Sequence, residues 1–173
     1  IYDGTGAVML SGETAAGKHP VEAVKTMALI AETTEKDINY IARLSKRPMQ
    51  KGIDSTNAIA HAAVTTAHDL GAKAVITVTK SGSTAKNISK YRPTCMIIGC
   101  TPDDTVHRQM SLSWGVVPVK MDEKSSTDEL FSAAIDAAKS HGLVEENDIV
   151  VITAGIPLGV AGKTNMLKVD TIK

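Results

Sequence analysis

The chain has 173 residues, with 19 basic and 19 acidic side chains and a hydrophobic content of 43%. These values are typical of one globular domain, or of one domain with an added segment. The zero net charge and the aromatic content of 3% argue against nucleic-acid binding, because there is no basic field and few rings for base stacking. No apolar stretch approaches the roughly 20 residues that a membrane-spanning helix needs, so we expect neither a membrane span nor a signal peptide in this sequence.

The first 48 residues predict one unit of strand, loop and helix. The apolar run Ala7–Leu10 predicts a short buried strand, and Ser11–Lys18 a loop of small and polar residues. Pro20 fits the first turn of a helix whose apolar spacing continues to about Leu44. A lone strand cannot satisfy its backbone groups, so it predicts a parent sheet that is missing here. Because the chain also begins at Ile1 and not at Met, we expect a piece of a longer protein.

Residues 49–173 predict a second domain, in which strands and helices alternate. This order predicts an α/β fold, a three-layer α/β/α open sheet of about five strands with helices on both faces. Pro118 in the third strand suggests an edge position. About ten residues join the last two strands, so the fifth is expected to be antiparallel. The expected strands are Ala74–Thr79, Met96–Gly99, Val116–Val119, Asp148–Thr153 and Asn165–Ile172.

The turn after the first of these strands carries the clearest functional pattern. Glycine permits a tight turn, hydroxyl groups cluster, a lysine adds charge, and a helix follows. Such a turn can hold a phosphate group at the carboxyl end of a strand, where ligands of open α/β sheets bind. The alternative is that Ser83 or Thr84 only caps the helix, and the residues alone leave both readings open. The candidate phosphate-binding residues are Thr79, Lys80, Ser81, Gly82, Ser83 and Thr84.

A glycine-rich connection precedes the last strand and ends in Gly162-Lys163-Thr164. It is not a P-loop, because Pro157 stands where that motif needs glycine and a strand, not a helix, is expected to follow. The remaining interpretations are a lid over a ligand or an ordinary hairpin loop, and the position near the Thr79 turn favours the lid. The candidate lid residues are Gly155, Pro157, Gly159, Gly162 and Lys163.

No other pattern predicts a catalytic or metal site. Cys95 and Cys100 are read as small core residues, because no second cysteine pair or spaced histidine accompanies them, and they are typical of a reducing cytosol. The histidines have no metal spacing. Ser11 and Glu13 could carry proton chemistry but have no third partner. We therefore expect a cytoplasmic protein with no metal in this chain.

Three segments resemble pyruvate kinases of the bacterial type. Asp3–Val24 closely resembles the last strand, loop and helix of the catalytic (β/α)8 barrel of that family. Thr79–Ala85 and Ser89–Pro93 resemble the start of the C-terminal domain, and Gly155–Val169 the closing effector loop and strand. The resemblances occur in order along the whole chain. They imply that residues 1–48 are a remnant of the barrel and residues 49–173 the C-terminal regulatory domain.

The resemblance implies a parent enzyme of glycolysis that transfers phosphate from phosphoenolpyruvate to ADP, with Mg²⁺ and K⁺ as cofactors. The barrel supplies most of the active site, so this chain alone is expected to be inactive, with Ser11 and Glu13 left from the edge of the substrate pocket. The family also implies a tetramer and a phosphorylated allosteric effector held by Thr79–Thr84 and covered by Gly155–Lys163. The alternative is a small α/β phosphate- or nucleotide-binding protein that acts alone.

The effector implied by the resemblance is a monophosphate. Family members that fructose 1,6-bisphosphate activates place a tryptophan and an arginine around Ser126–Phe131 for the second phosphate. Here Leu130 stands at the arginine position, and the segment has no tryptophan. The departure favours AMP or ribose 5-phosphate over fructose 1,6-bisphosphate.

Overall fold

A computed structural model of the chain describes residues 1–47, 54–158 and 163–173. Their contacts divide the chain into two compact units, Ile1–Asn39 and Tyr40–Lys173. The domain boundary expected between residues 48 and 49 falls outside the described residues and stays a prediction. None of the helices in the described ranges is both long and apolar enough to cross a membrane.

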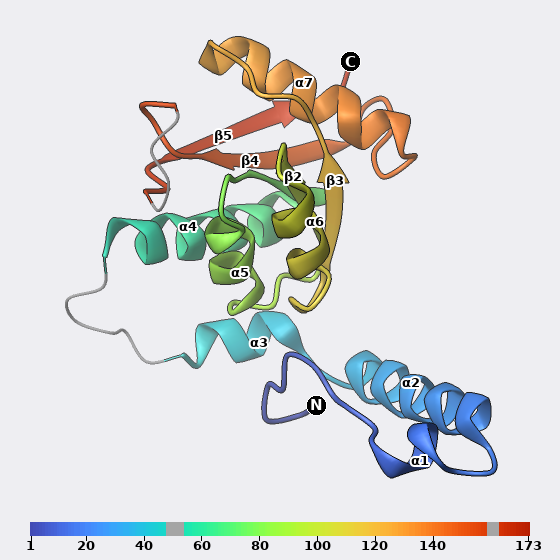
Figure 1. Cartoon of the computed structure of the whole chain (residues 1–173). Coiled ribbons are helices and arrows are strands. Elements are labelled where there is room, and N and C mark those ends of the chain that lie inside the picture. The colour runs from blue at the N-terminus through green and yellow to red at the C-terminus, as the bar shows by residue number, and fades with distance from the viewer. Residues whose placement is uncertain (48–53, 159–162) are drawn as a thin grey trace. The chain divides into compact units, whose positions relative to one another are not determined.

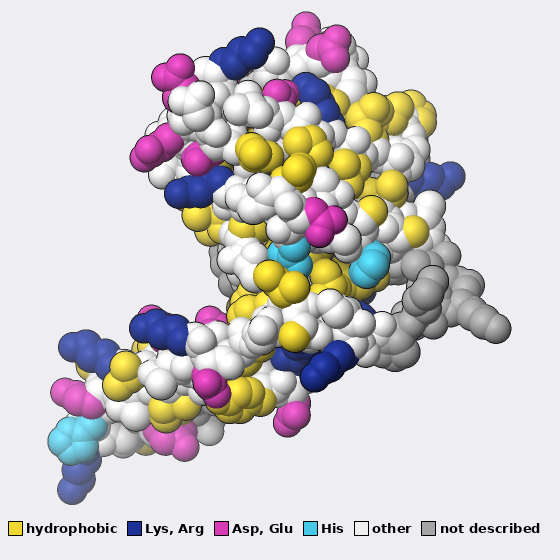
Figure 2. Space-filling view, turned by 180° about the vertical axis from the view of Figure 1, so that it is seen from behind, with side chains coloured by type: hydrophobic (Ala, Val, Ile, Leu, Met, Phe, Trp, Pro, Cys, Tyr) yellow, Lys and Arg dark blue, Asp and Glu magenta, His cyan; other side chains and the backbone are white. Residues whose placement is uncertain are grey.

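The first unit consists of α1 (Gly12–Ala15) and α2 (Pro20–Lys36) after an irregular N-terminal segment. The prediction of a buried strand at Ala7–Leu10 is wrong, since these residues pair with no strand and Met9 is 85% exposed. Among the described residues, no strand lies beside them to take up their backbone hydrogen bonds. Figure 2 shows hydrophobic side chains on the surface of this unit, and none of its residues is buried.

The helix predicted from Pro20 to about Leu44 is interrupted in the structure. α2 ends at Lys36, and a separate helix, α3 (Tyr40–Ser45), follows. Asp37 and Asn39 lie in the break, and both residue types favour caps and turns over helix interiors. The predicted loop Ser11–Lys18 is also partly helical, because it contains α1.

The second unit is built on a five-stranded sheet with the strand order β3-β2-β1-β4-β5 (Figure 1). The pairs β1–β2, β1–β4 and β2–β3 are parallel, and β4–β5 is antiparallel. The mixed sheet with an antiparallel last strand is confirmed. Pro118 lies on the edge strand β3, as predicted. The strands are β1 (Ala74–Val78), β2 (Met96–Thr101), β3 (Val116–Lys120), β4 (Ile149–Ala154) and β5 (Met166–Thr171).

Helices cover both faces of this sheet, so the predicted three layers are confirmed (Figure 1). The three central strands, β1, β2 and β4, are buried on both sides, and successive residues point to opposite faces. Thus Ile76 packs in one core with Phe131 of α7 (Thr127–Ser140), whereas Val75 packs in the other with Val64 of α4 and Ile88 of α5. The helices of the second face are α4 (Ser55–Leu70), α5 (Ser83–Ser89) and α6 (Asp104–Met110).

Local chemistry sets the ends of α4. The Asp54 carboxylate accepts a hydrogen bond from the Asn57 backbone N–H (2.7 Å), which caps the first turn. Gly71 ends the helix in the left-handed conformation, with φ of 59°. Ala60 and Val64 of this helix face the core and are buried, whereas its last residue, Leu70, is 44% exposed.

The short helix α3 belongs to the second unit. Leu44 packs against the core on the α4 face, and the Tyr40 ring centroid lies 5.3 Å from that of Trp114. Just after α3, the Arg47 guanidinium group lies 4.5 Å from the centroid of the Tyr91 ring, and its Nη1 donates to the Lys90 carbonyl oxygen (3.1 Å). Apolar packing and cation–π contacts therefore fix α3 to the sheet domain.

Candidate functional site

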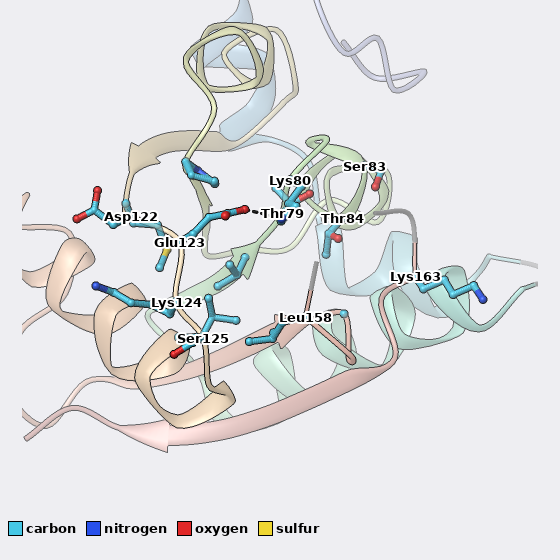
Figure 3. A pocket seen from close by; sticks show the side chains of 15 residues that line it. Thr79, Lys80, Ser83, Thr84, Asp122, Glu123, Lys124, Ser125, Leu158 and Lys163 are labelled. Atoms are coloured by element: carbon cyan, nitrogen blue, oxygen red, sulfur yellow. Dashed lines mark ion pairs between the residues drawn. The ribbon is translucent and has the colours of Figure 1, made fainter. Parts of the chain in front are cut away.

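A cavity of about 320 Å³ opens at the carboxyl ends of the parallel strands (Figure 3). Its walls come from the end of β1, the start of α5, the segment Met121–Ser125 after β3, Leu130 of α7, and the connection between β4 and β5. Ligands of open α/β sheets bind at this end. The cavity joins both segments that the sequence singled out, the Thr79 turn and the Gly155 connection.

One hydrogen bond within the Thr79 turn and one to the neighbouring strand β2 hold the turn in place. The Thr79 Oγ1 atom accepts from the Gly82 backbone N–H (3.0 Å), and the Thr79 N–H donates to the Cys100 carbonyl oxygen (3.0 Å). Gly82 has φ of 75°, and an added Cβ would lie 3.2 Å from Met110 Cγ. The turn therefore requires glycine at position 82.

Most of the hydroxyl groups of this turn lie along the cavity. Thr79, Lys80, Ser83 and Thr84 line it (Figure 3). Ser81 is not a lining residue of the cavity. Its side chain is exposed, and its Oγ donates to Ser83 Oγ (3.0 Å). Since α5 has only seven residues, its dipole gives little support to an anion. The hydroxyl groups and the lysine make the stronger case for anion binding.

The segment Met121–Ser125 forms a wall that sequence reasoning missed. It brings Asp122 and Glu123 to the cavity, and the Glu123 carboxylate forms an ion pair with the Lys80 ammonium group. The side chains of Lys80 and Glu123 are 45% and 62% exposed. Its place in the sequence could have predicted this role, because the segment directly follows the carboxyl end of a parallel strand.

The connection between β4 and β5 is closed at its base. An added Cβ on Gly155 would lie 2.2 Å from the Lys163 carbonyl oxygen, so the backbone leaves no room for a side chain. The Asn165 side chain accepts from the Ile156 N–H (2.8 Å) and donates to the Ile156 carbonyl oxygen (2.6 Å). These contacts hold the two ends of the connection together.

Some of the candidate lid residues line the cavity, one is exposed to solvent, and two lie outside the described residues. Gly155 and Lys163 line the cavity, but the Lys163 side chain is exposed and extends away from Thr79 and Thr84 in Figure 3. Pro157 is exposed. Gly159 and Gly162 lie outside the described residues, so whether this connection closes over a ligand stays a prediction.

Ser11 and Glu13 belong to the first unit and make a local cap. Both side chains are exposed, and the Glu13 Oε2 atom accepts from the Ser11 backbone N–H (3.0 Å). Hydrogen bonds from the N–H groups of Glu13 and Ser11 lower the pKa of the Glu13 carboxyl group. Across the described ranges, no group of three or more His, Cys, Asp or Glu side chains is arranged to hold a metal ion.

Comparisons with known proteins identify the family. A family profile described as pyruvate kinase, alpha/beta domain, matches residues 57–170. The pyruvate kinase of Clostridium acetobutylicum is 47% identical over 173 residues, which cover 100% of this chain and 37% of that enzyme. The pyruvate kinase of Geobacillus stearothermophilus is 46% identical over 172 residues, which cover 99% of this chain and 29% of that enzyme.

The fold leads to the same family. A crystal structure of a pyruvate kinase from Cryptosporidium parvum matches with a TM-score of 0.85 and 35% sequence identity, over 99% of this chain and 34% of that one. The chain thus spans about a third of the length of the relatives that it matches, and it corresponds to their C-terminal part. Since sequence and fold agree over almost the whole chain, it belongs to the pyruvate kinase family.

Proposed function

We propose that this chain is the effector-binding and subunit-contact region of a pyruvate kinase. The observation that carries the proposal is the cavity of about 320 Å³, where Thr79, Ser83 and Thr84 place hydroxyl groups beside Lys80. Hydroxyl groups and a lysine are suitable donors for a phosphate group. The volume suits a small ligand. The effector would act through a preference for one state of the assembled enzyme.

The cavity favours an effector with a single phosphate group. Away from the Thr79 turn, its wall carries the carboxylates of Asp122 and Glu123, the single lysine Lys124 and the buried side chain of Leu130. The two carboxylates outnumber Lys124 and repel a second phosphate group, and leucine offers it no donor. This supports AMP or ribose 5-phosphate over fructose 1,6-bisphosphate as the ligand.

The proposal assigns phosphoryl transfer from phosphoenolpyruvate to ADP to the remaining part of the enzyme, together with the Mg²⁺ and K⁺ ions. The relatives have about twice as much further sequence, and the described residues here include no metal-binding group. An apolar groove of Val8, Leu10, Met27 and Ile30 in the first unit suits packing against a catalytic barrel. We infer a cytoplasmic tetramer as the assembled enzyme, and no phosphoryl transfer by this chain alone.

Isothermal titration calorimetry of the 173-residue chain with AMP, ribose 5-phosphate and fructose 1,6-bisphosphate tests the effector site. The double variant Lys80→Ala, Ser83→Ala removes two donors without disturbing the buried hydroxyl group of Thr84. We expect its affinity for the monophosphates to fall about tenfold or more, as for the loss of charge-assisted hydrogen bonds.

Lys86→Ala is the matched control, because Lys86 is an exposed lysine of α5 that does not line the cavity. It should bind like the unmodified chain. If no phosphorylated ligand binds, or if the double variant binds as tightly as the control, the effector site proposed here is wrong. An assay with phosphoenolpyruvate, ADP, Mg²⁺ and K⁺ tests the expected lack of catalysis.

A further inference from the structure

The ion pair between Lys80 and Glu123 links the phosphate-binding turn to the acidic wall of the cavity (Figure 3). Lys80 follows β1, whereas Glu123 follows β3 in the segment Met121–Ser125. Both side chains line the cavity and both are partly exposed. A carboxylate oxygen of Glu123 therefore lies where the Lys80 ammonium group would meet a ligand oxygen.

Lys80 is the cation that matters for a phosphate in the Thr79 turn. The other lysines among the described lining residues are Lys124, in the acidic wall itself, and Lys163, whose side chain extends away from the turn in Figure 3. Of these three described lysines, only Lys80 adjoins the hydroxyl groups of that turn. Its positive charge is compensated by Glu123 before any ligand arrives.

We propose that Glu123 is a built-in competitor for the effector phosphate, an inference that rests on the function proposed above. In the free protein its carboxylate holds Lys80, and it releases Lys80 when a phosphate oxygen binds. The released carboxylate then accepts hydrogen bonds from hydroxyl groups of the same ligand and repels a second phosphate. Glu123 thereby selects sugar monophosphates over bisphosphates and over inorganic phosphate.

The exchange of partners is feasible because the ion pair is weak. Pairs with this degree of exposure are only marginally stabilising, and a phosphate dianion is a stronger partner for lysine than a carboxylate. Removal of the Glu123 charge eliminates both the competition and the repulsion. We expect it to tighten the binding of inorganic phosphate and fructose 1,6-bisphosphate about tenfold at low ionic strength.

The test compares Glu123→Gln with the unmodified chain by isothermal titration calorimetry, using inorganic phosphate, ribose 5-phosphate and fructose 1,6-bisphosphate. Glutamine keeps the size of the side chain but accepts hydrogen bonds from hydroxyl groups less strongly than a carboxylate does. The affinity for ribose 5-phosphate should therefore increase less than the affinity for the other two ligands. The gains should shrink at high salt, which screens exposed charges. Glu146→Gln is the control, because Glu146 is an exposed carboxylate that does not line the cavity.

The outcomes separate this inference from the proposed function. If the unmodified chain binds these ligands and Glu123→Gln binds all three with unchanged or lower affinity, the inference is overturned and the effector site stands. If neither protein binds any of the three ligands, the effector site and the inference are both overturned. Tighter binding of phosphate and bisphosphate in Glu123→Gln, with no change in Glu146→Gln, supports the competitor role.

Discussion

The Oγ1 atoms of Thr84 and Thr164 lie 2.7 Å apart, and both side chains are buried. Thr84 is in the first turn of α5, and Thr164 is at the end of the connection between β4 and β5. The Thr164 backbone N–H also donates to Thr56 Oγ1 in α4 (3.3 Å). Two helices therefore anchor the end of the segment that is predicted to act as a lid.

Replacing Thr164 by valine tests this anchor. Thr164→Val keeps the shape of the side chain but leaves the buried Thr84 hydroxyl group without this partner. We expect the free energy of unfolding to fall by about 1–2 kcal/mol, measured by urea denaturation. Thr171→Val is the control, because Thr171 is exposed on β5 and its change should stay within about 0.5 kcal/mol. An equal, small loss in both variants would show that the bond contributes nothing to stability.

Gly155→Ala tests the closed base of the same connection. The alanine Cβ would lie 2.2 Å from the Lys163 carbonyl oxygen, so the backbone of the connection must move. A loss of about 1–3 kcal/mol in the free energy of unfolding is expected, as for other overpacked sites. Gly12→Ala provides the comparison, since a Cβ at Gly12 meets nothing within 4 Å. A Gly155→Ala protein as stable as the unmodified chain would contradict the predicted clash.

The stability of the second unit should depend on pH through His68. Desolvation lowers the pKa of His68 below its ordinary value of 6.5, and the charge of Asp69 opposes this shift. The neutral ring accepts a hydrogen bond at Nε2 from the Thr94 N–H (3.0 Å). Because the unfolded chain binds the proton more readily, this contribution is present above about pH 6.5 and is lost as the pH falls through the folded pKa.

The measurement for His68 is urea unfolding between about pH 5 and pH 8. The free energy of unfolding should decrease on the acidic side of this range in the unmodified chain, and less so in His68→Gln, whose amide keeps an acceptor without titrating. Parallel pH profiles for the two proteins would rule out His68 as the cause.

The two cysteines should differ in reactivity. Burial raises the pKa of the Cys100 thiol to about 12, so only about one molecule in ten thousand is thiolate at pH 8. Burial also raises the pKa of Cys95, but its side chain is only half-buried. Iodoacetamide followed by mass spectrometry should modify Cys95 slowly in the native protein, and Cys100 only after unfolding. Early modification of Cys100 would mean that its strand opens readily.

The first unit is predicted to be the least stable part of the chain. None of the residues in Ile1–Asn39 is buried, and the expected strand at Ala7–Leu10 is absent. Hydrogen–deuterium exchange should therefore show rapid exchange over residues 1–18 and strong protection in β1 and β4, whose backbones lie inside the sheet. Strong protection of residues 1–18 would contradict this prediction.

The sequence predicted features that depend on local chemistry. The helix start at Pro20 and the edge position of Pro118 follow from the fixed φ and the missing N–H of proline, and both are confirmed. The five-stranded open sheet and its antiparallel fifth strand follow from regular alternation and from the length of one connection.

Features that depend on distant partners could not be predicted in this way. The strand expected at Ala7–Leu10 is absent because a strand forms only beside another strand, and an apolar run does not reveal whether such a partner exists. The acidic wall of Asp122 and Glu123 has an unremarkable sequence and gains a role only because β3 ends beside the cavity. Likewise, Tyr40 was predicted to lie inside one long helix, although its ring packs against Trp114 and the nearby Arg47 guanidinium group lies over the Tyr91 ring.

This docking makes the protein its own fluorescent reporter. Trp114 is the single tryptophan of the chain, and its ring packs against the Tyr40 ring. The Arg92 guanidinium group lies 4.4 Å from the centroid of the same Trp114 ring. Its carbonyl oxygen accepts from Ser89 Oγ at the end of α5 (2.6 Å). Emission from this one indole therefore responds both to detachment of α3 and to movement of the helix that begins at the cavity, without any added dye.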